Sequence, residues 1–241
     1  MRTRTTHFTI VADSVERIRN LLLGERGGFL FRRQQHISSL ILAAGLSSRM
    51  GSFKPMMAFR GKTLIENTIN SVLRGGAQSV LVVTGYRGAE LEYFLQDRYG
   101  SKVYFARNYY FAETDMMHSI QIGLSALPPC DAFFLLPGDM PVVHQSTFEK
   151  LLEVRSQSEI SIVFPTLGGY RKHPPLVDAR LIPEILAFQG SGGMRQLWQQ
   201  YDELIRTVSV DDEGVWVDLD TQNDYQKCRQ LYESIGLGGS N

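Results

Sequence analysis

Two cations lie in a glycine-rich segment that directly follows an apolar run at residues 39–42. Gly45 and Gly51 can adopt backbone angles that other residues avoid, and the small side chains between them let a ligand approach the main chain. Successive amide N–H groups in such a loop can converge on phosphate oxygens, and Arg49 and Lys54 would supply the countercharge. The segment therefore predicts an anion-binding loop at the end of a buried strand.

The carboxylate of Asp139 follows another apolar run, residues 131–136, within the sequence Pro-Gly-Asp-Met-Pro. The flanking prolines and glycine should hold it rigidly, with one side removed from water. Mg²⁺ prefers a few carboxylate oxygens together with phosphate oxygens and water, so one or two acids beside an anion-binding loop suffice. We therefore predict that Asp139 is a metal ligand. The alternative is a helix N-cap or a turn former.

The chain lacks the residue spacings of other common nucleotide-binding, metal-binding and catalytic motifs. A phosphate loop of the form G-x-x-x-x-G-K-[ST] would need a glycine five residues before Gly61, where the chain has Met56. The dinucleotide spacing G-x-G-x-x-G is absent too. The two cysteines, Cys130 and Cys228, lack metal-ligand spacing, and the sequence offers no convincing Ser/His/Asp or Cys/His constellation. An ordinary P-loop, a classical Rossmann site and covalent catalysis are therefore disfavoured.

Strands and helices alternate along the chain and would position these residues. Apolar runs predict strands at residues 39–42, 79–83, 102–106, 131–136 and 160–165. Helical spacing predicts helices at residues 63–73, 90–95, 116–127, 147–154, 183–188 and 196–201. Buried strands joined by helices form right-handed parallel crossovers, and ligands bind beyond the carboxyl ends of such strands. We predict a Rossmann-like three-layer α/β/α fold with a mostly parallel sheet, and a ligand-binding edge that includes Thr84 and Gly85.

The last third of the chain has a less regular pattern. Residues 166–176 are basic and glycine-rich, which predicts a flexible loop stiffened at its end by two prolines. Residues 206–210 and 215–219 predict two strands around a turn at 211–214, and residues 224–235 predict a terminal helix. Alternation would place Asp218 and Asp220 on one face of the second strand.

The length and the charge of the chain limit the number of domains and the classes of partner that it can bind. A chain of 241 residues can bury one substantial core, so we predict an accessory N-terminal extension of unknown role (1–36), one domain (37–235) and a flexible tail (236–241). Lys and Arg number 25, as do Asp and Glu, so no global field attracts nucleic acid or an acidic membrane. No apolar run reaches the roughly 18 residues of a membrane helix, and two distant cysteines suit a reduced compartment. We expect a cytoplasmic protein.

The glycine-rich segment resembles the signature L-A-[AG]-G-x-S-x-R-M-G-x-x-K of the nucleotidyltransferases that activate molybdopterin, within the wider MobA-like family of nucleoside-triphosphate transferases. The matching residues are Leu42, Ala43, Ala44, Gly45, Ser47, Arg49, Met50, Gly51 and Lys54. The resemblance implies that this loop binds a nucleoside triphosphate. The residues that we assign to nucleotide binding here are Leu42, Ala43, Ala44, Gly45, Ser48, Arg49 and Lys54.

The resemblance also gives roles to residues in the middle of the chain. An Asn that begins the segment before a helix, and a Ser that opens that helix, lie near the nucleotide in the family, which points to Asn108 and Ser119. Relatives usually carry a glycine after the acidic residue of this segment, whereas here Thr114 and Asp115 follow Glu113. Gly-Asp-Met-Pro is the family's metal-binding turn, so Gly138 joins the nucleotide-binding residues.

Two further segments resemble the acceptor side and the closing motif of the family. His173 lies in a segment similar to G-x-x-x-H-P-[PV]-L, which implies acceptor contact, although a structural role weighs equally. Arg195, beside a second glycine-rich turn at 190–195, could meet the pterin phosphate. The closing motif D-[IL]-D-T-P-E-D-Y appears with Gln222 and Asn223 in place of Pro and Glu, and Asp220 best matches its second metal ligand.

The implied reaction requires positioning more than reactive side chains. An acceptor phosphate oxygen attacks the α-phosphorus in line while pyrophosphate leaves, so no covalent nucleophile or general base is needed from the protein. The resemblance implies that Arg49 and Lys54 stabilise the leaving group, and that Asp139 and Asp220 hold Mg²⁺, with Mn²⁺ as the alternative. The catalytic candidates are therefore Arg49, Lys54 and Asp139.

The choice of nucleotide rests on finer features. Leu-Ala-Ala-Gly, together with G-D-M-P and H-P-P-L, resembles the cytidylyl-transferring branch, whereas the guanylyl branch opens Leu-Ala-Gly-Gly. The expected substrates are CTP and a molybdopterin-type phosphate acceptor, with a molybdenum hydroxylase or its chaperone as a candidate protein partner. The alternatives are a guanylyltransferase, a sugar- or polyol-phosphate nucleotidyltransferase, or a non-catalytic nucleotide-binding partner of a molybdenum hydroxylase. The intact lysine and two aspartates argue against the last of these.

Overall fold

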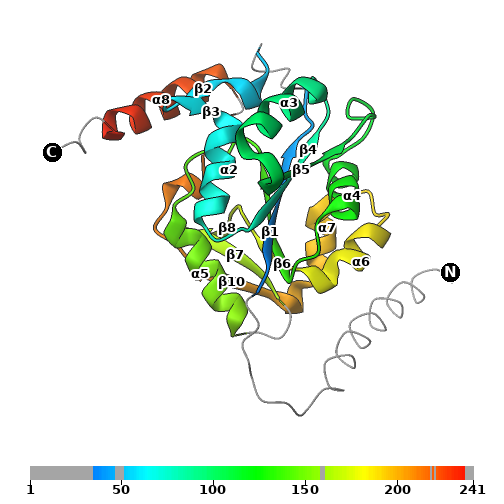
Figure 1. Ribbon diagram of the computed structural model, residues 1–241. Coiled ribbons are helices and arrows are strands. Elements are labelled where there is room, and N and C mark those ends of the chain that lie inside the picture. Colours follow the sequence, from blue (N-terminus) through cyan, green and yellow to red (C-terminus); the bar gives the residue numbers. More distant parts are fainter. Residues whose placement is uncertain (1–34, 47–51, 158–160, 218, 220, 237–241) are drawn as a thin grey trace.

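Figure 1 shows the computed structural model, which describes residues 35–46, 52–157, 161–217, 219 and 221–236. An eight-stranded sheet lies at its centre, with the strand order β10-β7-β9-β6-β1-β4-β5 and with β8 paired to β7. Helices cover both faces of the sheet, so the predicted three-layer α/β/α fold with a mostly parallel sheet is confirmed. The predicted extension 1–36, except for its last two residues, lies outside the described residues, as do residues 237–241 of the predicted tail.

Four adjacent strands run parallel and form one half of the sheet, from its middle to the β5 edge. They are β6 (Ala132–Pro137), β1 (Ile37–Ala43), β4 (Ser79–Thr84) and β5 (Val103–Arg107). Leu42 of β1 is in register with Val83 of β4 on one side and with Pro137 of β6 on the other. Parallel strands in this register end at the same edge, so the segments that follow all four emerge together, as predicted for the ligand-binding edge.

The other half of the sheet contains an antiparallel strand that the sequence pattern did not reveal. β9 (Leu176–Asp178) pairs antiparallel with both β6 and β7 (Ile162–Leu167), and β8 (Tyr170–Arg171) folds back onto β7. The prediction of one flexible loop over residues 166–176 is therefore wrong. Strands of two or three residues are too short to show alternation, and their partners are distant in the sequence.

Alternation along the buried strands divides the main core into two parts. Ile41 belongs to the part beneath α2 (Leu64–Arg74), α3 (Gly88–Tyr99) and α5 (Gln145–Ser156). Leu40 belongs to the opposite part, beneath α4 (Met116–Ala126), α6 (Ile182–Ala187) and α7 (Gly193–Gln200). Successive side chains of a strand point to opposite faces, which explains why strands covered on both sides have continuous apolar sequences.

After β10 (Ile205–Ser209), which runs parallel to β7, the chain turns instead of forming the second strand predicted there. The buried carboxylate of Asp212 accepts hydrogen bonds from Gly214 N (2.8 Å), His144 N (2.9 Å) and Thr147 Oγ1 (2.6 Å). These bonds fix the 3₁₀ turn η6 (Glu213–Val215) against the start of α5. The prediction of a strand at residues 215–219 is therefore wrong for the described residues, because a buried side chain and not the apolar pattern sets the local path.

The C-terminal helix α8 (Gln222–Gly236) packs on the small hairpin of β2 (Ala58–Phe59) and β3 (Lys62–Thr63), as Figure 1 shows. A third, smaller apolar cluster joins them, with Phe59, Leu219 and Tyr225 among its buried members. The hydroxyl of Tyr225 donates a hydrogen bond to the Ala58 carbonyl. Within the described residues, no helix is both long enough and apolar enough to cross a membrane.

Candidate active site

A cavity of about 840 Å³ lies at the carboxyl edge of the sheet. The strand order divides its lining into two halves on either side of β6. The first half consists of the segment after β1 and the segment between β5 and α4. The second half consists of the residues around β8 and the segment at the end of η6. Asp139, which follows β6, lies where the two halves meet.

The first half combines the small residues at the end of β1 with the N-terminus of α4. Ala43, Ala44 and Gly45 line it from the end of β1, so the predicted loop begins at the cavity. From the other segment, Asp115 caps α4 by accepting a hydrogen bond from His118 N at 2.9 Å. This half therefore presents small residues and short polar groups together with apolar side chains such as Phe111 and Met116.

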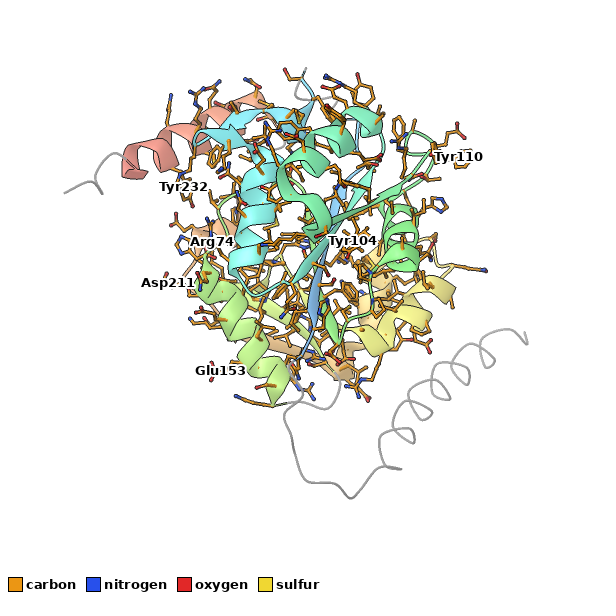
Figure 2. All side chains as sticks on the ribbon, in the orientation of Figure 1. Arg74, Tyr104, Tyr110, Glu153, Asp211 and Tyr232 are labelled. Atoms are coloured by element: carbon orange, nitrogen blue, oxygen red, sulfur yellow. The ribbon has the colours of Figure 1, made fainter. Side chains whose placement is uncertain are left out.

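Asn108 is fully buried and organises the first half from behind. Its backbone N–H donates to the Thr84 carbonyl at 2.8 Å, and its side-chain amide donates to the hydroxyls of Thr114 and Ser119 at 3.0 Å each. Its side-chain carbonyl accepts a hydrogen bond from Tyr110 N at 2.9 Å. Tyr110 itself points outward from this segment (Figure 2). Asn108 thus positions two cavity-lining hydroxyl groups without lining the cavity.

Thr84 and Gly85 also lie behind the lining. The hydroxyl of buried Thr84 donates to Glu92 Oε1 at 2.5 Å, and Arg107 Nε donates to the same oxygen at 3.0 Å. A Cβ atom at Gly85 would stand 2.5 Å from the Ala44 carbonyl oxygen and 2.8 Å from Phe111 Cβ. Glycine is therefore required where the two segments of the first half approach each other.

The centre of the cavity holds an ion pair between Lys54, the first residue of η2 (Lys54–Met56), and Asp139. The two side chains are only 13% and 22% exposed. Gly138 N donates to the Leu42 carbonyl at 2.9 Å, and the Thr68 hydroxyl donates to the Gly138 carbonyl at 3.1 Å. These bonds hold the turn after β6 against β1 and so fix the position of the Asp139 carboxylate.

The second half presents basic and aromatic side chains. The ammonium of Lys172 lies 3.1 Å from the centre of the Trp216 indole ring. His173 is exposed to the cavity, yet the surrounding protein lowers the pKa of its imidazole, against the opposing effects of a hydrogen bond to the Leu135 backbone and the charge of Asp139. The lowered pKa favours the neutral imidazole, which can donate and accept hydrogen bonds in the cavity.

The oxygen donors at the centre fit a hard divalent cation. Mg²⁺ keeps several waters and phosphate oxygens and takes only one or two protein carboxylates, and Asp139 offers such a carboxylate beside the cavity. Within the described ranges, no cluster of three or more His, Cys, Asp and Glu side chains could hold a metal by itself. The described residues would thus provide only part of a coordination sphere.

The structure brings most of the predicted site residues together. Those that line the cavity are Leu42, Ala43, Ala44, Gly45, Lys54, Ser119, Gly138, Asp139 and His173. Ser48, Arg49 and Asp220 lie outside the described residues. Arg195 is exposed within α7, which begins at Gly193, three residues before the predicted start of that helix. It is not among the described residues that line the cavity.

Several lining residues were not predicted from the sequence. They are Leu46, Pro55, Phe111, Thr114, Asp115, Met116, Met140, Arg171, Lys172, Val215, Trp216 and Val217, together with Pro137. Thr114 and Asp115 were recognised only as a departure from the family pattern. The only sequence feature that pointed to Lys172 as a lining residue was its position beside the predicted His173. No sequence feature pointed to Trp216, because its segment was predicted to be a strand.

Solved structures share this architecture. A nucleotidyl transferase from Methanothermobacter thermautotroptrophicus, Mth528, superposes with a TM-score of 0.71 at 24% identity, over 84% of this chain and 100% of that one. The manganese complex of Rv0371C from Mycobacterium tuberculosis H37Rv gives a TM-score of 0.62 at 21% identity, over 82% and 99% of the two chains. The protein thus has the nucleotide-diphospho-sugar transferase fold.

Sequence comparison narrows this class. The model of the MobA-like NTP transferase domain matches residues 39–204, which is more than half of the chain. The chain therefore belongs to the MobA-like NTP transferase family and is a nucleotidyltransferase. The molybdenum cofactor cytidylyltransferase of Escherichia coli (strain K12) is 29% identical over 201 residues, which are 83% of this chain and 98% of that protein.

Proposed function

We propose that the protein transfers CMP from CTP to the phosphate of a molybdopterin-type acceptor and releases pyrophosphate. The observation that supports this most is the Lys54–Asp139 pair, which stands between a backbone-lined half and a basic, aromatic half of one cavity. Two substrates placed in the two halves would meet beside it. The near full-length similarity to the E. coli cytidylyltransferase supports the choice of nucleotide and acceptor.

In this proposal, the first half of the cavity and the adjoining Lys54 bind the triphosphate. Backbone N–H groups after β1 and the ammonium of Lys54 would neutralise the β- and γ-phosphates, and Arg49 would add a second cation. Holding the α-phosphorus beside the acceptor phosphate converts a bimolecular reaction into a positioned one. The imidazole of His173 and the ammonium of Lys172 would orient the acceptor from the second half.

Asp139 would hold Mg²⁺, and Asp220 is the proposed second ligand. When bound, the cation neutralises charge on the transferring and accepting phosphates. Mn²⁺ is the alternative, since a solved structure of the same fold contains it. A molybdenum hydroxylase or its chaperone is the proposed recipient of the product, which links the reaction to molybdenum cofactor biosynthesis.

The test of the nucleotide is pyrophosphate release from CTP, GTP, ATP and UTP, each with molybdopterin and Mg²⁺. We expect CTP to be used at least about tenfold better than GTP in kcat/KM, which corresponds to about 1.4 kcal/mol in transition-state binding. The buried methyl group of Ala44 lines the first half, where a purine would need more room. Ala44→Gly should therefore reduce the preference for CTP over GTP in kcat/KM.

Faster release from GTP would overturn the cytidylyl assignment and leave the nucleotidyltransferase reaction standing. If pyrophosphate is released with a sugar phosphate or polyol phosphate but not with molybdopterin, the acceptor is a sugar or polyol phosphate and not molybdopterin. CTP binding without release for any acceptor would instead support a non-catalytic partner of a molybdenum hydroxylase.

A further inference from the structure

Trp216 presents an indole ring to the cavity, although large aromatic side chains are usually buried. The side chain is 59% exposed and belongs to the lining of the second half. The other tryptophan of the chain, Trp198, behaves differently, since it packs edge-to-face against Phe164 with 5.9 Å between the ring centres. One tryptophan thus stabilises the core, and the other offers an apolar face to whatever enters the cavity.

The ammonium of Lys172 covers this indole. It lies 3.1 Å from the centre of the Trp216 ring and 5.8 Å from that of Tyr170. Attraction between an ammonium and an aromatic face is weak where water has access, whereas a phosphate offers the same ammonium a full opposite charge. An anionic ligand in the second half would therefore draw Lys172 away and uncover the face of the indole.

The backbones that carry both side chains are anchored. Lys172 N donates to the Pro165 carbonyl at 2.8 Å, which continues the pairing of β8 with β7. Trp216 N donates to the Glu213 carbonyl at 2.9 Å, directly after the turn that Asp212 holds. The two side chains can therefore rearrange while their attachment points stay in place.

We propose that Trp216 and Lys172 form an acceptor clamp: the indole stacks on a planar heteroaromatic ring of the acceptor, and the ammonium pairs with the acceptor's phosphate. The ligand class is a planar bicyclic heterocycle that carries a phosphate ester, such as a pterin phosphate. This inference rests on the proposed function for the identity of the acceptor, and it adds residues that determine acceptor specificity. The clamp lies on the other side of Asp139 from the first half, where the proposed function places the nucleotide.

The clamp is tested by calorimetric binding of two probes to the full chain. The probes are 6-hydroxymethylpterin monophosphate, which has a planar ring, and ribose 5-phosphate, which does not. We expect Trp216→Leu to weaken binding of the pterin phosphate by about tenfold or more, on the scale measured for base–aromatic stacking. Trp216→Phe should retain most of the affinity, and Trp216→Leu should bind ribose 5-phosphate like the unaltered protein. Lys172→Gln should weaken the binding of both phosphates.

Trp198→Phe is the matched control, and it should bind both probes normally. Unchanged pterin phosphate affinity in Trp216→Leu, or no binding to the unaltered protein, would overturn the clamp. An equal loss for both probes in Trp216→Leu would also overturn it, because stacking would not be the cause.

Pyrophosphate release from CTP, measured on the same variants, separates the clamp from the proposed function. Pterin phosphate binding that depends on Trp216, with no transfer to molybdopterin, would refute the proposed reaction and leave the clamp standing. Efficient transfer to molybdopterin with the same KM in Trp216→Leu would refute the clamp and leave the reaction standing.

Discussion

At the scale of single residues, the pairing of Lys54 with Asp139 explains how two charges persist in a mostly enclosed position. Removing one partner of such a pair leaves the other charge uncompensated, which costs more than the pair itself contributes. The negative charge of a triphosphate and the positive charge of a cation would each give one member of the pair a new partner. The pair is thus suited to exchange partners during binding.

Asp139→Asn should reduce Mg²⁺-dependent transfer by about 10² or more, the scale of losing a principal electrostatic contributor. The side-chain shape is kept, so the chain should still fold, but the loss of one charge of the pair should lower the melting temperature. The variant removes a negative charge beside the cavity, so CTP binding without metal should be retained or strengthened. Steady-state kinetics and calorimetry measure the two effects, with Asp97→Asn, on an exposed position of α3, as the control. Near-normal turnover of Asp139→Asn at limiting Mg²⁺ would show that Asp139 is not a metal ligand.

At the scale of elements, the ends of neighbouring strands support one another behind the cavity. Gly85 follows β4 and leaves room for the Ala44 carbonyl and Phe111, which belong to the two segments of the first half. Asn108 follows β5 and bonds to the last residue of β4 and to the first turns of α4. The position of the lining of the first half therefore depends on residues that do not themselves line the cavity.

Gly85→Ala should displace the segment after β1, because the new methyl group would overlap the Ala44 carbonyl oxygen. Overpacking of this kind costs about 1–3 kcal/mol, and we expect a lower melting temperature together with a higher KM for CTP. Gly45→Ala is the matched control for stability, since an added Cβ there meets no atom within 4 Å. Equal melting temperatures for Gly85→Ala and the unaltered protein would show that the two segments are not rigidly held.

At the scale of the whole molecule, burial makes folding sensitive to alkaline pH. Burial raises the pKa of the Cys130 and Cys228 thiols from 9.0 to about 11, and burial, aided by the charge of Glu66, raises the pKa of Tyr99 from 10.0 to about 12. All three groups therefore keep their protons in the folded chain at pH values where the unfolded chain releases them. Their contribution to stability is present below about pH 9 and is lost as pH rises toward 11 and 12.

The melting temperature should accordingly fall as the pH is raised from 8 to 10.5, as followed by circular dichroism. In the double variant Cys130→Ala/Cys228→Ala, two of the three groups are gone, so the dependence on pH should be shallower, whatever the variant's stability at pH 8. A melting temperature that stays constant or rises over this range would contradict the burial of these groups.

The sequence by itself determined the features that depend on local pattern. Continuous apolar runs predicted β1, β4 and β6, because a strand covered on both faces needs no polar side chain. The glycine-rich segment after β1 and the turn around Asp139 were predicted to meet because parallel strands share one carboxyl edge, and the structure brings Gly45, Lys54 and Asp139 to one cavity.

Only the tertiary structure determined which residues form the second half of the cavity. β8 and β9 form because distant strands offer them partners, and the buried carboxylate of Asp212 turns the chain where apolar residues predicted a strand. Lys172 and Trp216 are 44 positions apart in the sequence, and neither carries a local signal for the other. They meet because β8 and β10 flank β7 on opposite sides, and the chain after β10 turns through η6 beside β7 to bring Trp216 to Lys172.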